Sequence, residues 1–141
     1  MAEATDAGAR LLCGGERGGC FVEPSVLVDV PHHARLWCEE VFGPVVCVQR
    51  YDDLGEALAV ANDSRYGLQA GVFTRSIDVV WRCFEGLEVG AVIHDDAPTF
   101  RVDAMPYGGV KESGQGREGL RDAIREMTEP RMLALRPRIT T

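Results

Sequence analysis

The chain has 141 residues, of which 45% are hydrophobic and 26% charged, and its formal net charge is −7. This length accommodates one ordinary domain with a core, and the composition is typical of a globular chain. The acidic balance argues against a nucleic-acid-binding protein, which needs a concentrated basic surface. No basic start precedes an apolar run and no stretch approaches about 20 apolar residues, so we expect no signal peptide, no membrane span and a cytoplasmic protein.

The first half of the chain predicts two strands followed by a helix. Residues 26–30 and 45–51 are β-branched runs of strand length. Asp53 and Glu56 have the spacing of a capping box, and the apolar residues that follow share one helical face until about Asn62.

The second half predicts a helix that lies between two strands. Ser76 opens a segment with an apolar stripe at helical spacing, and short strands are expected at residues 71–74 and 89–93. A helix between strands indicates a βαβ unit with parallel pairing, so the expected fold class is α/β with a mainly parallel sheet and flanking helices.

The last forty residues predict a turn, a short helix and a final strand. Residues 114–119 match G-x-G-x-x-G, but a polar segment precedes them, which favours a structural turn over a dinucleotide-binding loop. A third helix is expected around residues 120–127. Residues 131–136 predict a strand with an unpaired edge, which needs a partner.

The cysteines and histidines do not predict a metal site. Five cysteines without a C-x-x-C pair indicate reduced, mostly structural thiols. His32, His33 and Cys38 lack a second cluster that would complete four ligands. His94 and the two aspartates after it follow a predicted strand, but neighbouring side chains of an extended segment point in opposite directions.

Glu40 and Phe42 form a more informative pair. At i and i+2 of an extended segment, a carboxylate and an aromatic ring project to the same side. The carboxylate can accept hydrogen bonds from two ribose hydroxyls, and the ring can lie against a planar base. An acidic loop with a core phenylalanine explains the same residues equally well.

Several segments, taken in order, resemble the C-terminal portion of the catalytic domain of the NAD(P)-dependent aldehyde dehydrogenase superfamily. They cover nearly the whole chain: residues 9–15, 21–27, 61–62, 66–68, 70–74 and 89–92, Glu-Glu-Val-Phe-Gly-Pro-Val at 39–45, and the Met-Pro-Tyr-Gly-Gly run at 105–119. Residues 98–103, Pro-Thr-Phe-Arg-Val-Asp, look like the subgroup that oxidises lactaldehyde, phosphonoacetaldehyde or semialdehydes.

The resemblance implies roles in cofactor binding and catalysis. In that family a cysteine thiolate attacks the aldehyde, NAD or NADP accepts the hydride, and water activated by a glutamate releases the acid. By resemblance, Glu40 would hold the nicotinamide ribose and Phe42 would pack on the nicotinamide ring. Glu118 matches a position implicated in the water relay.

The resemblance also implies substrate and interface residues. Tyr107 would line the substrate tunnel, and Arg117 and Glu129 match a pair that supports the subunit interface. Arg101 could bind an anionic aldehyde bidentately, or it could be a surface residue that pairs with Asp103.

The departures from the family pattern concern the reaction itself. The family's nucleophile lies in a Gly-Gln-x-Cys context and its base in a Glu-Leu-Gly-Gly context, and the 141 residues contain neither. His94 stands where the family usually has Asn. We therefore expect a partial catalytic domain (residues 1–128) with an oligomerisation strand and tail (residues 129–141), a partial NAD(P) site, and no activity alone.

The expected partners follow from this reading. They are a small-molecule aldehyde and other copies of the chain in a homo-oligomer. Two other functions stay open: a non-catalytic module that joins full-length dehydrogenase subunits, and one half of a split enzyme whose N-terminal half is a separate chain.

Overall fold

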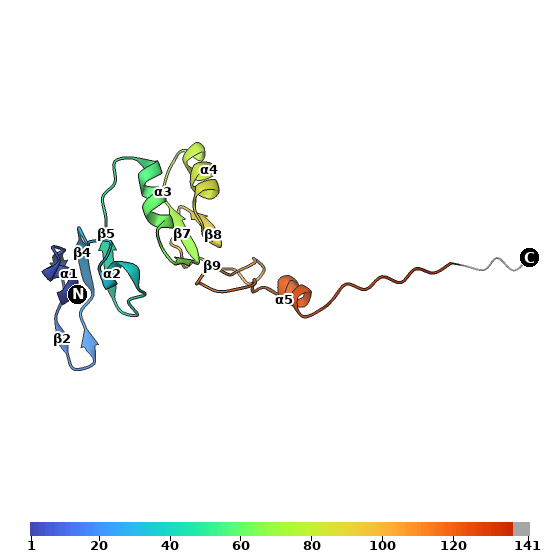
Figure 1. Ribbon diagram of the computed structural model, residues 1–141, viewed down its shortest axis with the longest axis horizontal. Coiled ribbons are helices and arrows are strands. Elements are labelled where there is room, and N and C mark those ends of the chain that lie inside the picture. Colours follow the sequence, from blue (N-terminus) through green and yellow to red (C-terminus); the bar gives the residue numbers. More distant parts are fainter. Residues whose placement is uncertain (137–141) are drawn as a thin grey trace, which may run out of the picture. The chain divides into compact units, whose positions relative to one another are not determined.

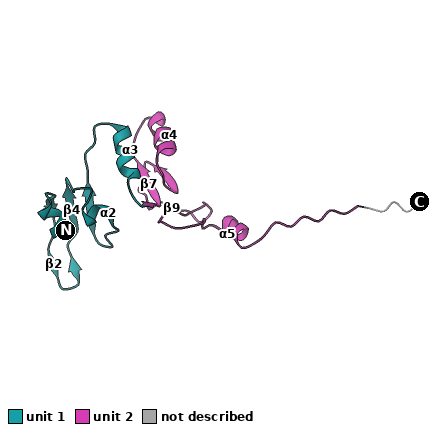
Figure 2. Ribbon diagram, in the orientation of Figure 1, with its two compact units in different colours: residues 1–65 teal, residues 66–141 magenta. Residues whose placement is uncertain are grey.

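The computed structural model of the chain describes residues 1–136, and these form two compact units (Figure 2). The first unit is Met1–Arg65, and the second begins at Tyr66. The sequence did not predict this boundary.

The first unit is built on a three-stranded sheet, with its elements labelled in Figure 1. The sheet order is β1-β4-β5, in which β4 pairs antiparallel with β1 and parallel with β5. The remaining elements are three helices and a short hairpin of β2 and β3. Their bounds are α1 (Ala2–Asp6), β1 (Arg10–Cys13), β2 (Arg17–Gly18), β3 (Phe21–Val22), β4 (Ser25–Val28), α2 (Arg35–Cys38), β5 (Val45–Val48) and α3 (Leu54–Asn62).

The core of the first unit surrounds the central strand β4. Leu27 is completely buried and packs with small residues from α1, from the loop after it and from the segment before α2. Ser25, also buried, accepts a hydrogen bond from the Gly15 amide (2.9 Å) and donates one to the Glu23 carbonyl (2.8 Å). This satisfied hydroxyl fixes the turn that leads into β4.

Two N-caps that the sequence predicted are confirmed, one in each unit. The Asp53 carboxylate accepts from the Glu56 amide at 3.0 Å at the start of α3. The Ser76 hydroxyl accepts from the Val79 amide at 3.4 Å at the start of α4 (Ile77–Gly86). Each cap satisfies an amide that has no partner within its helix.

The second unit contains a parallel strand pair, an antiparallel strand pair and two helices (Figure 1). Strand β7 (Gln69–Val72) pairs parallel with β8 (Ala91–His94), and α4 connects them, as the sequence predicted. Strand β6 (Tyr66–Gly67) pairs antiparallel with β9 (Val110–Lys111). Together the two units confirm a mixed α/β architecture.

The glycine run at residues 114–119 is a turn, as predicted. Gly114, Gly116 and Gly119 have φ values of 131°, 75° and 123°, which side chains other than glycine rarely adopt. Helix α5 (Leu120–Glu126) follows directly, with Gly119 as its N-cap. The run therefore reverses the chain and starts a helix.

Other expectations are only partly met. Residues 131–136 pair with no strand of the described chain, so the predicted final strand is not seen in the single chain. The prediction of mostly structural thiols is wrong on burial: all five are free, but only Cys83 is buried and Cys13, Cys20 and Cys38 are exposed. Among residues 1–136, no helix has the length and apolarity of a membrane crossing.

Candidate functional site

Three of the predicted site residues meet in the second unit, and we call them the Arg101 cluster: Arg101, Tyr107 and Glu118. Its base is an isolated antiparallel bridge between Tyr107 and Glu118. Each amide donates to the other residue's carbonyl, at 2.9 Å from Tyr107 and 2.6 Å from Glu118. Residues directly opposite one another in an antiparallel pair present their side chains on one face. The backbone therefore sets the two side chains beside each other.

Arg101 completes the cluster from the preceding loop. Its Nη2 donates to Glu118 Oε2 at 3.0 Å, and its guanidinium carbon lies 4.5 Å from the centroid of the Tyr107 ring. Of the two alternatives left open by the sequence, the surface pair with Asp103 is not formed, because the bridge brings Glu118 within reach instead. About half of the Arg101 side chain (46%) and two thirds of that of Glu118 (66%) stay exposed. The pair is thus open to water and to small ligands.

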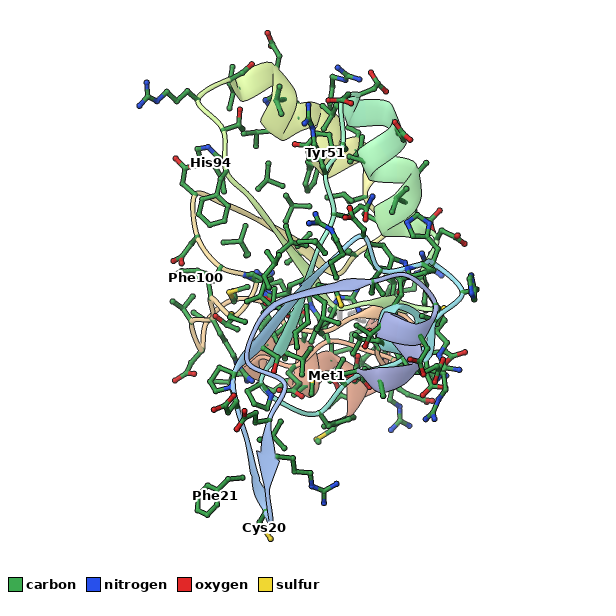
Figure 3. The ribbon with its side chains drawn as sticks, turned by 90° about the vertical axis from the view of Figure 1, so that its left-hand side faces the viewer. Met1, Cys20, Phe21, Tyr51, His94 and Phe100 are labelled. Carbon is green, nitrogen blue, oxygen red and sulfur yellow. The ribbon has the colours of Figure 1, made fainter. Side chains whose placement is uncertain are left out.

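The loop that carries Arg101 is fixed at its beginning. His94 Nε2 lies 2.8 Å from the Thr74 carbonyl, and Asp95 Oδ1 accepts from the Thr74 amide at 3.2 Å. These contacts join the ends of β7 and β8. Further along, the Phe100 carbonyl accepts from Gln69 Nε2 at 3.3 Å. Figure 3 labels His94, at the end of β8, and Phe100, which directly precedes Arg101. His94, which stands where the resemblance expects Asn, here links the end of β8 to Thr74, just after β7.

Arg117 contacts the glycine turn of its own unit. Its Nη1 donates to the carbonyls of Gly109 (2.9 Å) and Gly116 (2.7 Å), and its amide donates to Glu126 Oε1 at 3.0 Å. Glu129 is exposed and forms no ion pair with Arg117 within the described residues. Within the described residues Arg117 therefore stabilises the glycine turn, and its role at a subunit interface stays a prediction.

A hollow of about 330 Å³ lies beside the cluster. Tyr107, Glu118 and Arg117 belong to its lining, together with glycines of the turn and Leu68 and Glu126. It provides space next to the cluster for a small polar molecule.

The two residues expected to hold a cofactor lie in the first unit. Phe42 is 93% exposed and has a φ of 46°, so the assumption of a regular extended segment is wrong. Glu40 lines a hollow of about 210 Å³, whereas Phe42 lines another of about 590 Å³ with Phe21. The structure therefore places the two side chains in different, adjoining hollows that share Met1, Leu36 and Val41.

The chemistry of these two residues nevertheless fits a nicotinamide nucleoside. Glu40 has no hydrogen-bond or ion-pair partner within residues 1–136, so its carboxylate can accept from ribose hydroxyls. A bulky residue at positive φ is uncommon, and at Phe42 this backbone conformation leaves the apolar ring exposed to water. The second exposed ring, Phe21, sits at the tip of the β2–β3 hairpin and points away from the ribbon (Figure 3). Such rings suit contact with a planar partner.

Two other groups near this region have shifted pKa values. The hydrogen bond from Arg35 to Glu39 (3.0 Å) lowers the pKa of the Glu39 carboxyl. Burial raises the pKa of the Cys47 thiol, which makes it a poor nucleophile at neutral pH. Within the described part of the chain, no group of three His, Cys, Asp or Glu residues is arranged for a metal ion.

Comparison with known proteins places the chain in a family. The family model described as "Aldehyde dehydrogenase family" matches residues 1–133. The chain belongs to the aldehyde dehydrogenase family. The match confirms the resemblance at the level of the family, whose members are oxidoreductases.

Individual aldehyde dehydrogenases are similar over almost the whole chain. A 3-sulfolactaldehyde dehydrogenase of Priestia megaterium is 46% identical over 133 residues, which are 94% of this chain and 28% of that protein. Aldehyde dehydrogenase 21 from Physcomitrella patens, solved with the reaction product succinate, has a TM-score of 0.88 at 48% identity over 91% of this chain and 27% of that one. An aldehyde dehydrogenase of Bacillus cereus, solved with NAD+, has a TM-score of 0.84 at 39% identity over 91% and 26%. The chain thus spans little more than a quarter of these relatives.

Proposed function

We propose that this chain forms the C-terminal part of an aldehyde dehydrogenase catalytic domain and recognises an anionic aldehyde that is oxidised to the acid with NAD(P)+. The observation that carries the proposal is the Arg101 cluster. Its guanidinium is held by Glu118 at 3.0 Å and by the Tyr107 ring, yet about half of the side chain faces solvent. A pre-oriented arginine with free donors suits the oxygens of a carboxylate or sulfonate.

The cofactor would supply the hydride acceptor, and this chain would supply part of its binding surface. Glu40 would accept hydrogen bonds from the nicotinamide ribose, and Phe42 would lie against the nicotinamide. Support comes from the exposure of both side chains and from the lack of a partner for Glu40 within residues 1–136. The resemblance adds Glu118 as part of a water relay.

The nucleophile would come from outside these 141 residues. None of the five cysteines lies in a Gly-Gln-x-Cys context. Cys47 has a raised pKa and Cys83 is buried, so neither is suited to attack an aldehyde. The Cys-bearing part would be an N-terminal half or a full-length dehydrogenase subunit.

Residues 129–141, of which 137–141 lie outside the described residues, would provide an oligomerisation strand and tail that follow a partial catalytic domain at residues 1–128. Support comes from exposed apolar side chains that a lone chain leaves in water: Leu120, Ile124, Met127, Met132, Leu133 and Leu135. Apolar surface of this kind is covered in oligomers of soluble proteins.

Reconstitution tests the proposal. The chain is combined with the Cys-bearing N-terminal part of the enzyme, and NAD(P)H formation is followed with succinic semialdehyde and with the uncharged propionaldehyde. We expect turnover only in the combined sample, with a lower KM for the anionic aldehyde. A combined sample that shows turnover without preferring the anion would contradict the substrate class, and a sample without turnover would contradict the proposed place in the enzyme.

A further inference from the structure

Arg101 is the member of its cluster that a loop carries. Residues 98–103 belong to no helix or strand. The backbone is held just before Arg101, where Gln69 Nε2 donates to the Phe100 carbonyl at 3.3 Å. An arginine side chain rotates about several bonds and loses much rotamer freedom when it is held in one position. A fixed backbone therefore does not by itself fix where the guanidinium points.

Tyr107, in contrast, is fixed through its main chain. Its amide donates to the Glu118 carbonyl and its carbonyl accepts from the Glu118 amide, so the segment that carries the ring is part of a β-bridge. The residue is half-buried, and its hydroxyl has no hydrogen-bond partner within residues 1–136. The ring is thus the part of the side chain that contacts Arg101.

The two contacts of the guanidinium constrain it in different ways. Glu118 accepts one hydrogen bond, from Nη2 of Arg101 to Oε2 at 3.0 Å, and a single bond leaves the group free to rotate about it. The Tyr107 ring covers one face, with the guanidinium carbon 4.5 Å from the ring centroid, and this contact limits that rotation. The other N–H donors lie in the guanidinium plane, so the contact that fixes the plane also fixes the direction in which they meet an anion.

The magnitudes of the two contacts decide whether the ring matters beside the ion pair. The side chains of Arg101 and Glu118 are 46% and 66% exposed, and an exposed ion pair shifts an equilibrium by a factor of about five at most. A cation–π contact that is partly exposed to water contributes a factor of roughly two to five. The ring contact is therefore comparable with the ion pair, and its loss is large enough to measure.

We propose that Tyr107 is a positioning residue, which orients Arg101 for the anionic end of the substrate through its ring and not through its hydroxyl. The inference rests on the proposed function, since it requires Arg101 to bind that end. It differs from the tunnel-lining role that the resemblance implies, in which Tyr107 would contact the substrate itself. It applies to carboxylates, sulfonates and phosphonates alike, because each of them meets the same oriented donors.

The backbone bridge allows the ring to be changed while the site stays in place. Tyr107→Phe keeps the ring and removes the hydroxyl. Tyr107→Leu removes the ring and keeps an apolar side chain. Tyr107→Met, with a longer and more flexible side chain, takes its place if circular dichroism shows that the leucine variant is not folded. Tyr51→Leu is the matched control, because it removes an exposed tyrosine ring from the first unit.

The test uses the 141-residue chain labelled with ¹⁵N and follows the Arg101 Nε–H signal, which is assigned by its loss in Arg101→Lys. Nuclear relaxation of that signal gives an order parameter, which measures how tightly the side chain is held. Titration with methanesulfonate then measures anion binding, and the neutral dimethyl sulfone serves as the control ligand.

We expect the Arg101 side chain to be equally well ordered in the wild-type chain and in Tyr107→Phe. Tyr107→Leu should lower the order parameter of the free chain and weaken methanesulfonate binding by roughly two- to fivefold, because the cation–π contact is lost. Tyr51→Leu should leave both quantities unchanged. A side chain that only lined the tunnel would affect ligand binding without changing the motion of Arg101 in the free chain.

The contrary outcomes separate the inference from the proposed function. If Tyr107→Leu keeps the wild-type affinity, Arg101 needs no ring to bind the anion, and the inference is wrong while anion binding stands. If the affinity falls but the order parameter does not, Tyr107 contacts the ligand and does not position Arg101. Equal losses in Tyr107→Phe would assign the effect to the hydroxyl. If methanesulfonate moves the wild-type signal no more than dimethyl sulfone does, the anion site itself is absent, and the proposed substrate class fails together with the inference.

Discussion

The two regions that carry predicted site residues differ in how far the chain alone completes them. In the second unit, Arg101, Tyr107 and Glu118 hold one another through a backbone bridge, an ion pair and a ring contact. In the first unit, Glu40 and Phe42 are exposed and line separate hollows. The proposed substrate site is therefore assembled within these residues, whereas the residues proposed to bind the cofactor do not contact one another.

The largest effect that we expect is the lack of turnover by the isolated chain, whose cofactor and substrate residues have no nucleophile beside them. We expect no NAD(P)H formation from any aldehyde, because no cysteine here has the family's nucleophile context. The absorbance of NAD(P)H measures its formation, and the reconstituted enzyme serves as the positive control. Turnover by the chain alone that a single Cys→Ala substitution abolishes would disprove this prediction.

A tenfold effect is expected at the cofactor end. In the reconstituted enzyme Glu40→Gln should slow hydride transfer by roughly tenfold or more, because a carboxylate that accepts ribose hydrogen bonds contributes about 1.5 to 3 kcal/mol per bond. Single-turnover kinetics gives the rate. Glu39→Gln is the matched control: its carboxylate is already engaged by Arg35, so its loss should have little effect. If the two substitutions slow hydride transfer equally, Glu40 does not bind the cofactor.

The smallest effects are expected at the two helix caps, one in each unit. Asp53→Ala and Ser76→Ala should each lower the free energy of unfolding by about 1 kcal/mol, since each leaves a helix amide without its side-chain acceptor. The shorter bond at Asp53, 3.0 Å against 3.4 Å at Ser76, predicts the larger loss there. Urea unfolding measures both. A larger loss for Ser76→Ala would show that bond length does not rank these caps.

The sequence predicted those parts of the fold that depend on nearby residues. Helices α3 and α4 begin at the predicted caps, Asp53 and Ser76, because a cap is a contact across three residues. The parallel pairing of β7 and β8 followed from the helix between them. The hairpin of β2 and β3 was missed, since its strands have two residues each and show no periodicity.

The sequence singled out Arg101, Tyr107 and Glu118 separately but did not predict that they contact one another. Asp103 is two residues from Arg101, whereas Glu118 is 17 residues away and reaches it only through the bridge to Tyr107. The sequence named Phe42, but the assumed extended backbone was wrong, because the positive φ of Phe42 breaks the alternation that would place it on the same side as Glu40. Residues 131–136 cannot show a strand without a second chain to pair with.

The measurement that tests the account most directly is the response of the reconstituted enzyme to Arg101→Ala with one anionic and one neutral aldehyde. Removing the guanidinium deprives only the anion of a charge-assisted partner, so the KM for succinic semialdehyde should rise by roughly tenfold or more while that for propionaldehyde stays nearly unchanged. Equal losses on both substrates would mean that Arg101 is structural, and would contradict the assignment of this cluster to the anionic end of the substrate.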